Sequence, residues 1–236
     1  MSSAIIIPGR LNSSRLPGKV LLDLGGKPVI QHVYEKALAA DIGPVYIATD
    51  SRKVQTVCAA FADVILTQEH HSGTDRVIEA AQRLSQENII NIQGDEPFID
   101  PVLIQKLNTA LEQGEYWISA AHEIHKPEDI NNPNIVKVVV DVNQHALYFS
   151  RARLPYVRDG EAQPPCYRHV GVYGYKKTFL EQWVKLPQGQ LENIERLEQL
   201  RGIEAGYKLK IINVDDVSGG IDTAEDLALA RKRVTS

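Results

Sequence analysis

One stretch near the start of the sequence is the most informative about the fold: Ile5-Ile6-Ile7-Pro8-Gly9-Arg10-Leu11-Asn12-Ser13-Ser14-Arg15-Leu16-Pro17-Gly18-Lys19. Residues 4–8 form a short apolar run that predicts a buried strand. The run ends in a loop with two glycines, two prolines and three cations, Arg10, Arg15 and Lys19. Positive charge and small residues at a strand end suit a polyphosphate, because the cations neutralise the anion and small residues let the backbone approach it. The stretch therefore predicts an anion-binding loop after the first strand.

Composition limits the class of protein. The 236 residues are 43% hydrophobic and 24% charged, which is typical of a folded globular chain. A net charge of −4 gives no reason to expect nucleic-acid binding. No segment approaches the roughly 18 uninterrupted apolar residues of a membrane span, and no secretory signal is apparent. Two cysteines, Cys58 and Cys166, cannot form a disulfide framework or a four-cysteine zinc site. We expect a cytoplasmic protein.

Strand and helix patterns alternate through the first half of the chain. Strands are expected at residues 4–8, 45–49, 64–66, 89–93 and 117–122. Helices are expected from Pro28, after Asp50, after Arg76, and from Pro101 to about Gln113. Because regular alternation favours a parallel sheet covered on both faces, we predict an α/β fold with a mostly parallel central sheet and helices on both faces.

The regular alternation of strand and helix patterns ends after about residue 125. Residues 142–175 are interpreted as an antiparallel excursion from the main sheet that serves as a lid or a dimer contact. The elements expected beyond residue 125 are strands at 136–140, 146–150, 170–175 and 209–214 and helices at 179–184, 194–205 and 223–233. No linker divides the chain, so residues 1–236 are expected to form a single domain.

The polar residues most suited to chemistry fall after predicted strands. They are the loop 10–19, Asp50, the turn 93–96, and Asp222 before the last helix. Ligands of open α/β sheets bind at the carboxyl ends of the strands. Asp95 and Asp222 are candidates for holding a hard cation, because Mg²⁺ typically takes one or two carboxylates together with phosphate oxygens and water.

Several other kinds of catalytic or nucleotide-binding site are disfavoured because the sequence lacks their motifs. Gly9 stands too far from Gly18-Lys19 for a P-loop, and Val20 replaces the metal-binding hydroxyl. No G-x-G-x-x-G follows a strand, no G-x-S-x-G is present, and His122-Glu123-Ile124-His125 has the wrong spacing for a zinc protease. Dinucleotide-dependent, serine-hydrolase and zinc-protease chemistry are therefore disfavoured.

Simpler structural roles remain open for some of these residues. Asp222 could cap the final helix, a role compatible with metal binding. Without further information, His169 in an apolar strand is more often structural than ligating, and Glu198 could pair with Arg201 on a helix surface.

Taken together, the motifs resemble those of the 3-deoxy-manno-octulosonate (KDO) cytidylyltransferases, also called CMP-KDO synthetases. The resemblance runs in order along nearly the whole chain. The motifs that carry it are the loop 8–19, Gly26-Lys27-Pro28, Ala48-Thr49-Asp50, Ser72-Gly73-Thr74-Asp75-Arg76, Gln93-Gly94-Asp95-Glu96-Pro97, Tyr148-Phe149-Ser150-Arg151, Arg168-His169-Val170-Gly171-Val172-Tyr173, Leu197-Glu198-Gln199-Leu200-Arg201 and Ile221-Asp222-Thr223.

The resemblance implies a Rossmann-like nucleotidyltransferase fold and the coupling of CTP to KDO, giving CMP-KDO and pyrophosphate for lipopolysaccharide synthesis. It implies Mg²⁺ held by Asp95 and Asp222, with Lys19 as a further catalytic residue, and it suggests a homodimer. The nucleotide would be bound by Arg10, Ser14, Arg15 and Lys19. The sugar acid would be bound by Arg76, Gln93, Arg151, His169, Tyr173 and Glu198. Arg151 is the expected partner of its carboxylate, through a bidentate contact.

Alternative functions stay open at the level of sequence. The same reaction could use the 8-amino analogue of KDO or another sugar acid as the preferred substrate. A sugar-1-phosphate nucleotidyltransferase, a nucleotide-sugar glycosyltransferase and a non-catalytic nucleotide sensor are more distant alternatives.

Overall fold

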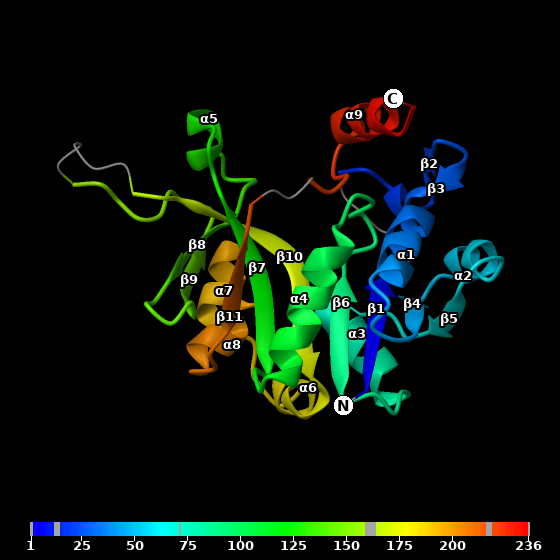
Figure 1. Cartoon of the computed structure of the whole chain (residues 1–236), viewed down its shortest axis with the longest axis horizontal. Helices are drawn as coiled ribbons and strands as arrows, with labels where there is room; N and C mark the ends of the chain where they lie inside the picture. Colours follow the sequence, from blue (N-terminus) through cyan, green and yellow to red (C-terminus); the bar gives the residue numbers. More distant parts are fainter. Residues whose placement is uncertain (1, 12–14, 71, 159–163, 216–218, 236) are drawn as a thin grey trace.

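A nine-stranded sheet runs through the computed structural model, which describes residues 2–11, 15–70, 72–158, 164–215 and 219–235. The order along its main path is β11-β7-β10-β6-β1-β4-β5 (Figure 1). The strands of this path are β1 (Ser3–Pro8), β4 (Val45–Thr49), β5 (Asp63–Leu66), β6 (Asn88–Ile92), β7 (Trp117–Glu123), β10 (Tyr167–Lys176) and β11 (Lys210–Val214).

The parallel part of the sheet is centred on β1. This strand pairs in parallel with β4 on one side and with β6 on the other, and β4 pairs in parallel with β5. Every residue of β1 is buried, because successive side chains enter the cores on opposite faces of the sheet. Ile5 and Ile7 pack into one core, whereas Ala4 and Ile6 pack into the other. This two-sided burial explains the uninterrupted apolar run in the sequence.

Helices cover both faces, as predicted. The first core contains residues of α1 (Val29–Ala39), α2 (Arg52–Cys58) and α4 (Pro101–Glu112). The second core contains residues of α3 (Gly73–Gln82), α6 (Lys177–Trp183) and α8 (Leu200–Glu204), with α7 (Gln190–Glu195) packed against it. A smaller apolar cluster holds α9 (Ala224–Thr235) against the short ribbon of β2 (Asp23–Leu24) and β3 (Lys27–Pro28).

The antiparallel part of the second half is confirmed, and it reaches further into the sheet than an excursion. β10 lies between β6 and β7 and runs antiparallel to both, while β11 pairs in parallel with β7. A hairpin of β8 (Lys137–Val140) and β9 (Ala146–Ser150) extends the sheet beside β10. β10 is therefore a strand inside the sheet and not part of an excursion from it.

One predicted element is wrong. The helix expected over 194–205 is two short helices, α7 and α8, which are separated at Arg196 by a left-handed backbone conformation (φ 56°, ψ 47°). An ion pair between Arg201 Nη2 and Glu192 Oε1, 2.6 Å long, joins the two helices across this break. The apolar spacing of this segment is helical on both sides of the break, so periodicity alone predicted one continuous helix.

Smaller elements were not expected. They include α5 (Pro127–Ile130), a 3₁₀ turn at Lys19–Leu21, and the ribbon of β2 and β3. The described residues between β9 and β10, 151–158 and 164–166, extend toward the left of Figure 1, and Tyr156 among them is 84% exposed. Over the described ranges, the chain contains no helix with the length and apolar character needed to cross a membrane.

Candidate active site

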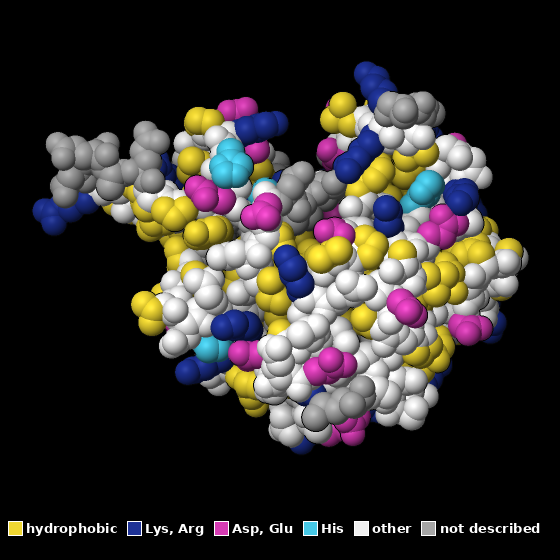
Figure 2. All heavy atoms as spheres, in the orientation of Figure 1, with side chains coloured by type: hydrophobic (Ala, Val, Ile, Leu, Met, Phe, Trp, Pro, Cys, Tyr) yellow, Lys and Arg dark blue, Asp and Glu magenta, His cyan; other side chains and the backbone are white. Residues whose placement is uncertain are grey.

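The carboxyl ends of β1 and β6 meet at the upper edge of the sheet in Figure 1. The molecular surface is hollowed at this edge between α5 and α9, and charged side chains of both signs surround the hollow (Figure 2). A cavity of about 290 Å³ is lined by residues from both halves of the chain. Seven of the predicted site residues line it: Arg10, Lys19, Arg76, Gln93, Asp95, Tyr173 and Glu198.

Close backbone packing brings Asp95 to the loop that follows β1. Gly94 lies so near β1 that a Cβ there would stand 2.7 Å from the carbonyl oxygen of Pro8. Any larger residue would push the two strand ends apart. Glycine at this position therefore lets Asp95 face Lys19 directly, and the two side chains form an ion pair.

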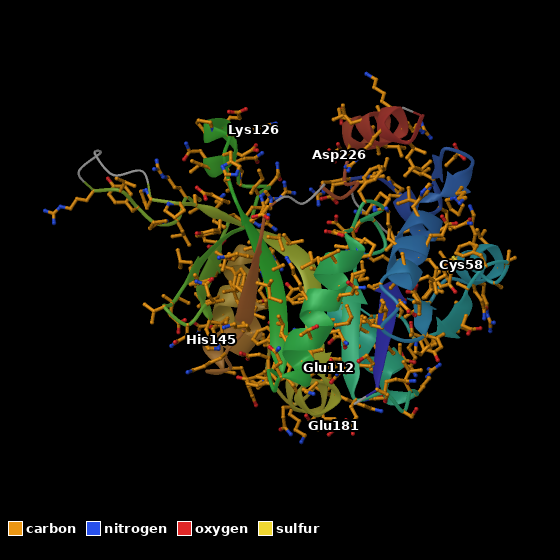
Figure 3. The ribbon with its side chains drawn as sticks, in the orientation of Figure 1. Cys58, Glu112, Lys126, His145, Glu181 and Asp226 are labelled. Atoms are coloured by element: carbon orange, nitrogen blue, oxygen red, sulfur yellow. The ribbon has the colours of Figure 1, made fainter. Side chains whose placement is uncertain are left out.

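Asp222 reaches the same place from the end of the chain. The amide of Ile221 donates to the carbonyl oxygen of Asp95 at 2.8 Å. A Cβ on Gly220 would stand 2.7 Å from Glu96 Oε1, so a larger residue here would make the Glu96 side chain shift. Asp226, labelled in Figure 3 at the start of α9, accepts hydrogen bonds from the amides of Asp222 at 3.1 Å and Thr223 at 2.8 Å. These contacts hold the backbone on either side of the Asp222 side chain.

Lys19 joins the two carboxylates. Its Nζ contacts Asp95 and lies 2.7 Å from Asp222 Oδ1, while Arg15 Nη2 lies 3.0 Å from Asp222 Oδ2. Burial alone would lower the pKa of Lys19, but Asp95 and Asp222 together raise it above its usual value. Burial would raise the pKa of Asp222, but Lys19 and Arg15 hold it below its usual range. Lys19 and Asp222 are therefore both charged at neutral pH.

A third carboxyl group, that of the half-buried Glu96, lies beside this cluster. Burial raises its pKa to about 8, and the negative charges of Asp95 and Asp222 add to the rise. Glu96 Oε2 has no hydrogen-bond partner among the described residues. Because this pKa keeps Glu96 largely protonated at neutral pH, Glu96 adds no full negative charge to the cluster.

The placement of the two aspartates fits a hard cation. Asp95 and Asp222 converge on a single atom, Lys19 Nζ, so both carboxylates reach one small region. The described residues contain no group of three or more His, Cys, Asp or Glu side chains arranged to hold a metal by themselves. That arrangement suits Mg²⁺, which usually retains water and takes phosphate oxygens beside one or two carboxylates.

The opposite part of the cavity is formed by an irregularity in β10. The pairing of β10 with β7 shifts register between Val170 and Tyr173. Ser119 Oγ fills the irregularity, 2.8 Å from the carbonyl oxygen of Val172. The shift places Gly171 and Tyr173 in the cavity lining. Bulges of this kind often redirect a side chain next to an active site.

His169 lies just outside the cavity lining. Its Nε2 is 2.9 Å from Ser119 Oγ, and its ring lies edge-on against Phe149 with the ring centroids 5.0 Å apart. Because the single hydroxyl proton of Ser119 is directed to a backbone carbonyl, Nε2 is the donor in this bond. Burial lowers the pKa of His169 to about 3, with a further contribution from Arg168. The imidazole is therefore neutral and supports Tyr173, whose ring centroid lies 5.5 Å away.

The break between α7 and α8 carries a further part of the lining, residues Arg196 to Gln199. Glu198 Oε2 accepts a hydrogen bond of 2.6 Å from Thr74 Oγ1, which fixes its carboxylate against α3. Non-glycine residues in the left-handed conformation cost about 1–2 kcal/mol. The strain at Arg196 therefore accompanies the placement of this lining segment.

Arg76 is almost fully buried at 2% exposure, between this cavity and a neighbouring one that also contains Arg10 and Asp50. Its guanidinium donates to Asp50 Oδ2 at 2.9 Å and to Thr67 Oγ1 at 2.8 Å. The predicted substrate-binding residue Arg76 thus already has a carboxylate partner.

Arg151 was predicted to bind the sugar acid, but the structure does not support a direct contact. It does not belong to the described lining of the cavity. Its Nε donates to the carbonyl oxygen of Glu195, and its Nη1 donates to that of Pro133, each at 3.0 Å. Arg15 is also outside the lining but contacts Asp222, and Ser14 lies outside the described residues.

Sequence reasoning missed two residues. Glu96 was quoted within a motif but was given no role, although its position next to Asp95 at a strand end was a usable signal. Arg196 was hidden because it fell inside an apparently continuous helical pattern. Only the left-handed backbone brings it to the cavity.

A cationic loop that faces two carboxylates at the carboxyl edge of an α/β sheet is typical of a protein that binds a phosphate-bearing ligand. The sequence profile of the cytidylyltransferase family matches residues 4–211. The chain therefore belongs to the cytidylyltransferase family.

Individual relatives refine this assignment. The chain is 44% identical to an 8-amino-3,8-dideoxy-manno-octulosonate cytidylyltransferase of Shewanella pealeana, over 100% of this chain and 99% of the relative. It is also 44% identical to a 3-deoxy-manno-octulosonate cytidylyltransferase of Saccharophagus degradans, over the full length of both. The fold matches a CMP:2-keto-3-deoxy-manno-octonic acid synthetase solved with CTP, with a TM-score of 0.95, 39% identity, and coverage of 100% and 99%.

Proposed function

We propose that the chain transfers the CMP group of CTP to a KDO-type sugar acid and releases pyrophosphate. The observation that carries this proposal is that Lys19 and Asp95 line a cavity whose other lining residues can bind a polyhydroxylated acid, while Asp222 contacts Lys19 from outside the lining. Similarity to synthetases of both KDO and its 8-amino analogue supports this substrate class.

The chain's own residues suit the two halves of the reaction. Arg10 and Lys19 line the cavity from the loop after β1 and would neutralise the triphosphate as negative charge builds on the leaving pyrophosphate. Gln93, Tyr173 and Glu198 would bind hydroxyl groups of the sugar and hold its anomeric oxygen in line with the α-phosphorus. The carboxylates of Asp95 and Asp222 would bind a cation beside the triphosphate.

Asp95 and Asp222 are the residues that would hold Mg²⁺. When bound, the ion supplies charge stabilisation at the reacting phosphate and favours ionisation of the attacking hydroxyl. Lys19 bridges the two carboxylates and keeps them close together, and it helps to hold the pKa of Asp222 below its usual range.

The function is tested by incubating the protein with CTP, Mg²⁺ and either KDO or its 8-amino form and measuring pyrophosphate. We expect release with at least one of them and a requirement for the divalent ion. The ratio of kcat/KM for the two sugars identifies the preferred substrate. Absence of release with every 2-keto sugar acid would exclude the proposal.

We also propose that the chain acts in the cytoplasm as a single domain and as a homodimer. The described residues between β9 and β10 are the candidate contact, because they expose Tyr156. Light scattering coupled to gel filtration is expected to give twice the 26.3 kDa mass of the chain. Tyr156→Asp should shift the mass toward one chain, and a monomeric wild type would contradict the dimer.

A further inference from the structure

The last helix, α9, is connected to all three segments that carry the cluster of Lys19, Asp95 and Asp222. Asp222 lies just before the first residue of the helix. Leu16, from the loop that contains Lys19, packs against the apolar cluster that includes α9. Phe98, which follows Asp95 in the same turn, packs against that cluster as well. One helix therefore joins the loop, the turn and the second aspartate.

The apolar face of α9 is small. Leu227 and Ala230 are its two buried side chains over the described part of the helix. They pack beside β2 and β3, where α9 lies at the top of Figure 1. Because a helix in a protein is stabilised mainly by the packing of an apolar face, a helix with so small a face depends on further contacts for its position.

Two arginines in the second half of α9 supply such contacts. The guanidinium carbon of Arg233 lies 4.2 Å from the ring centroid of Phe98, which is a cation–π contact. Arg231 Nε and Nη2 donate to the carbonyl oxygen of Asp23 at 3.1 and 3.0 Å. Asp23 begins β2, shortly after the 3₁₀ turn that starts at Lys19. Arg231 therefore ties α9 to the first segment of the cluster, and Arg233 ties it to the second.

The turn between Asp95 and Phe98 is tightly hydrogen-bonded. The amide of Glu96 donates to the carbonyl oxygen of Gln93, and the amide of Ile99 donates to that of Glu96, each at 3.2 Å. These bonds leave little slack between the Phe98 ring and the Asp95 backbone. Because Phe98 is only half-buried, the core does not fix its ring alone, and the guanidinium above it adds a constraint.

We propose that Arg233 is a positioning residue for the reaction: by holding the Phe98 ring, it keeps Asp95 aligned with Lys19 and Asp222. This inference rests on the proposed function and adds to it a residue outside the cavity lining. A small misplacement of a catalytic group lowers the rate of a reaction that depends on precise geometry. The loss should appear in kcat, because the charge at the reacting phosphate changes most in the transition state.

The test compares Arg233→Gln and Arg233→Lys with the control Leu229→Gln, on the same helix at a residue that is 65% exposed. In Arg233→Gln, hydrogen exchange at the amides of Glu96 and Ile99 should become about three- to tenfold faster, the size expected for a lost cation–π contact. The kcat for pyrophosphate release should fall by a similar factor, with the KM for the sugar acid unchanged. Arg233→Lys keeps the cation and should recover most of both values, and the control should match the wild type.

Phe98→Leu tests the route from the helix to the turn. In this background, Arg233→Gln should have little further effect on exchange or on kcat, because the ring that receives the guanidinium is gone. Unchanged exchange in Arg233→Gln, additive effects with Phe98→Leu, or a lower melting temperature with unchanged kcat would overturn the positioning role. Wild-type protein that releases no pyrophosphate would instead exclude the proposed function, and the exchange rates would still show whether Arg233 orders the turn.

Discussion

Asp95→Asn and Asp222→Asn are each expected to lower kcat/KM for pyrophosphate release by about three orders of magnitude, equivalent to about 4 kcal/mol of transition-state stabilisation. Both carboxylates contact Lys19 Nζ and both are proposed to hold the catalytic cation. An amide retains the size and one oxygen but removes the charge. The loss should appear mainly in kcat, because the charge at the reacting phosphate changes most in the transition state.

The folded state should survive these changes. Each variant leaves Lys19 with its other carboxylate, so the melting temperature should change little. Asp63→Asn is a matched control, since Asp63 is exposed at the start of β5, at the opposite edge of the sheet. Turnover close to wild type in Asp95→Asn or Asp222→Asn would remove that residue from the proposed metal site.

Lys19→Met is expected to lower kcat/KM by about 10²–10³-fold, the size of effect seen when a preorganised charge-stabilising donor is removed. It should also lower the free energy of unfolding by about 1–3 kcal/mol, because the carboxylates of Asp95 and Asp222 lose the ammonium that lies between them. Thermal melting and steady-state kinetics measure the two effects separately.

The change in melting temperature on adding Mg²⁺ is a second measurement for Lys19→Met, and it does not depend on activity. If Asp95 and Asp222 hold the ion, added Mg²⁺ should raise the melting temperature of Lys19→Met more than that of the wild type, since no ammonium competes for the carboxylates. Lys27→Met is the control, because Lys27 pairs with Glu35 on the exposed surface. Equal responses to Mg²⁺ in all three proteins would contradict the proposed metal ligands.

Much of the fold follows from local sequence patterns. The apolar run of β1 is buried on both faces, and the boundaries expected for 45–49 and 146–150 agree with β4 and β9. These strands were predictable because each one's apolar residues and turn signals lie within a few positions of one another. The placement of β10 between β6 and β7 was not predictable, since strand order depends on contacts between residues distant in sequence.

The site, like the fold, has features that the sequence predicts and features that only long-range contacts decide. The sequence by itself determined the chemical types: cations after β1, carboxylates at 95 and 222, and hydrogen-bonding groups on later strands, since parallel strand ends share one edge of the sheet. Only the tertiary structure decided which predicted residues reach the cavity. The break at Arg196 was not predictable, since a left-handed residue inside a helical pattern has no local signal. The contact of Arg151 with Glu195, formed between residues 44 apart in sequence, directs the Arg151 side chain to backbone carbonyls and not to the cavity lining.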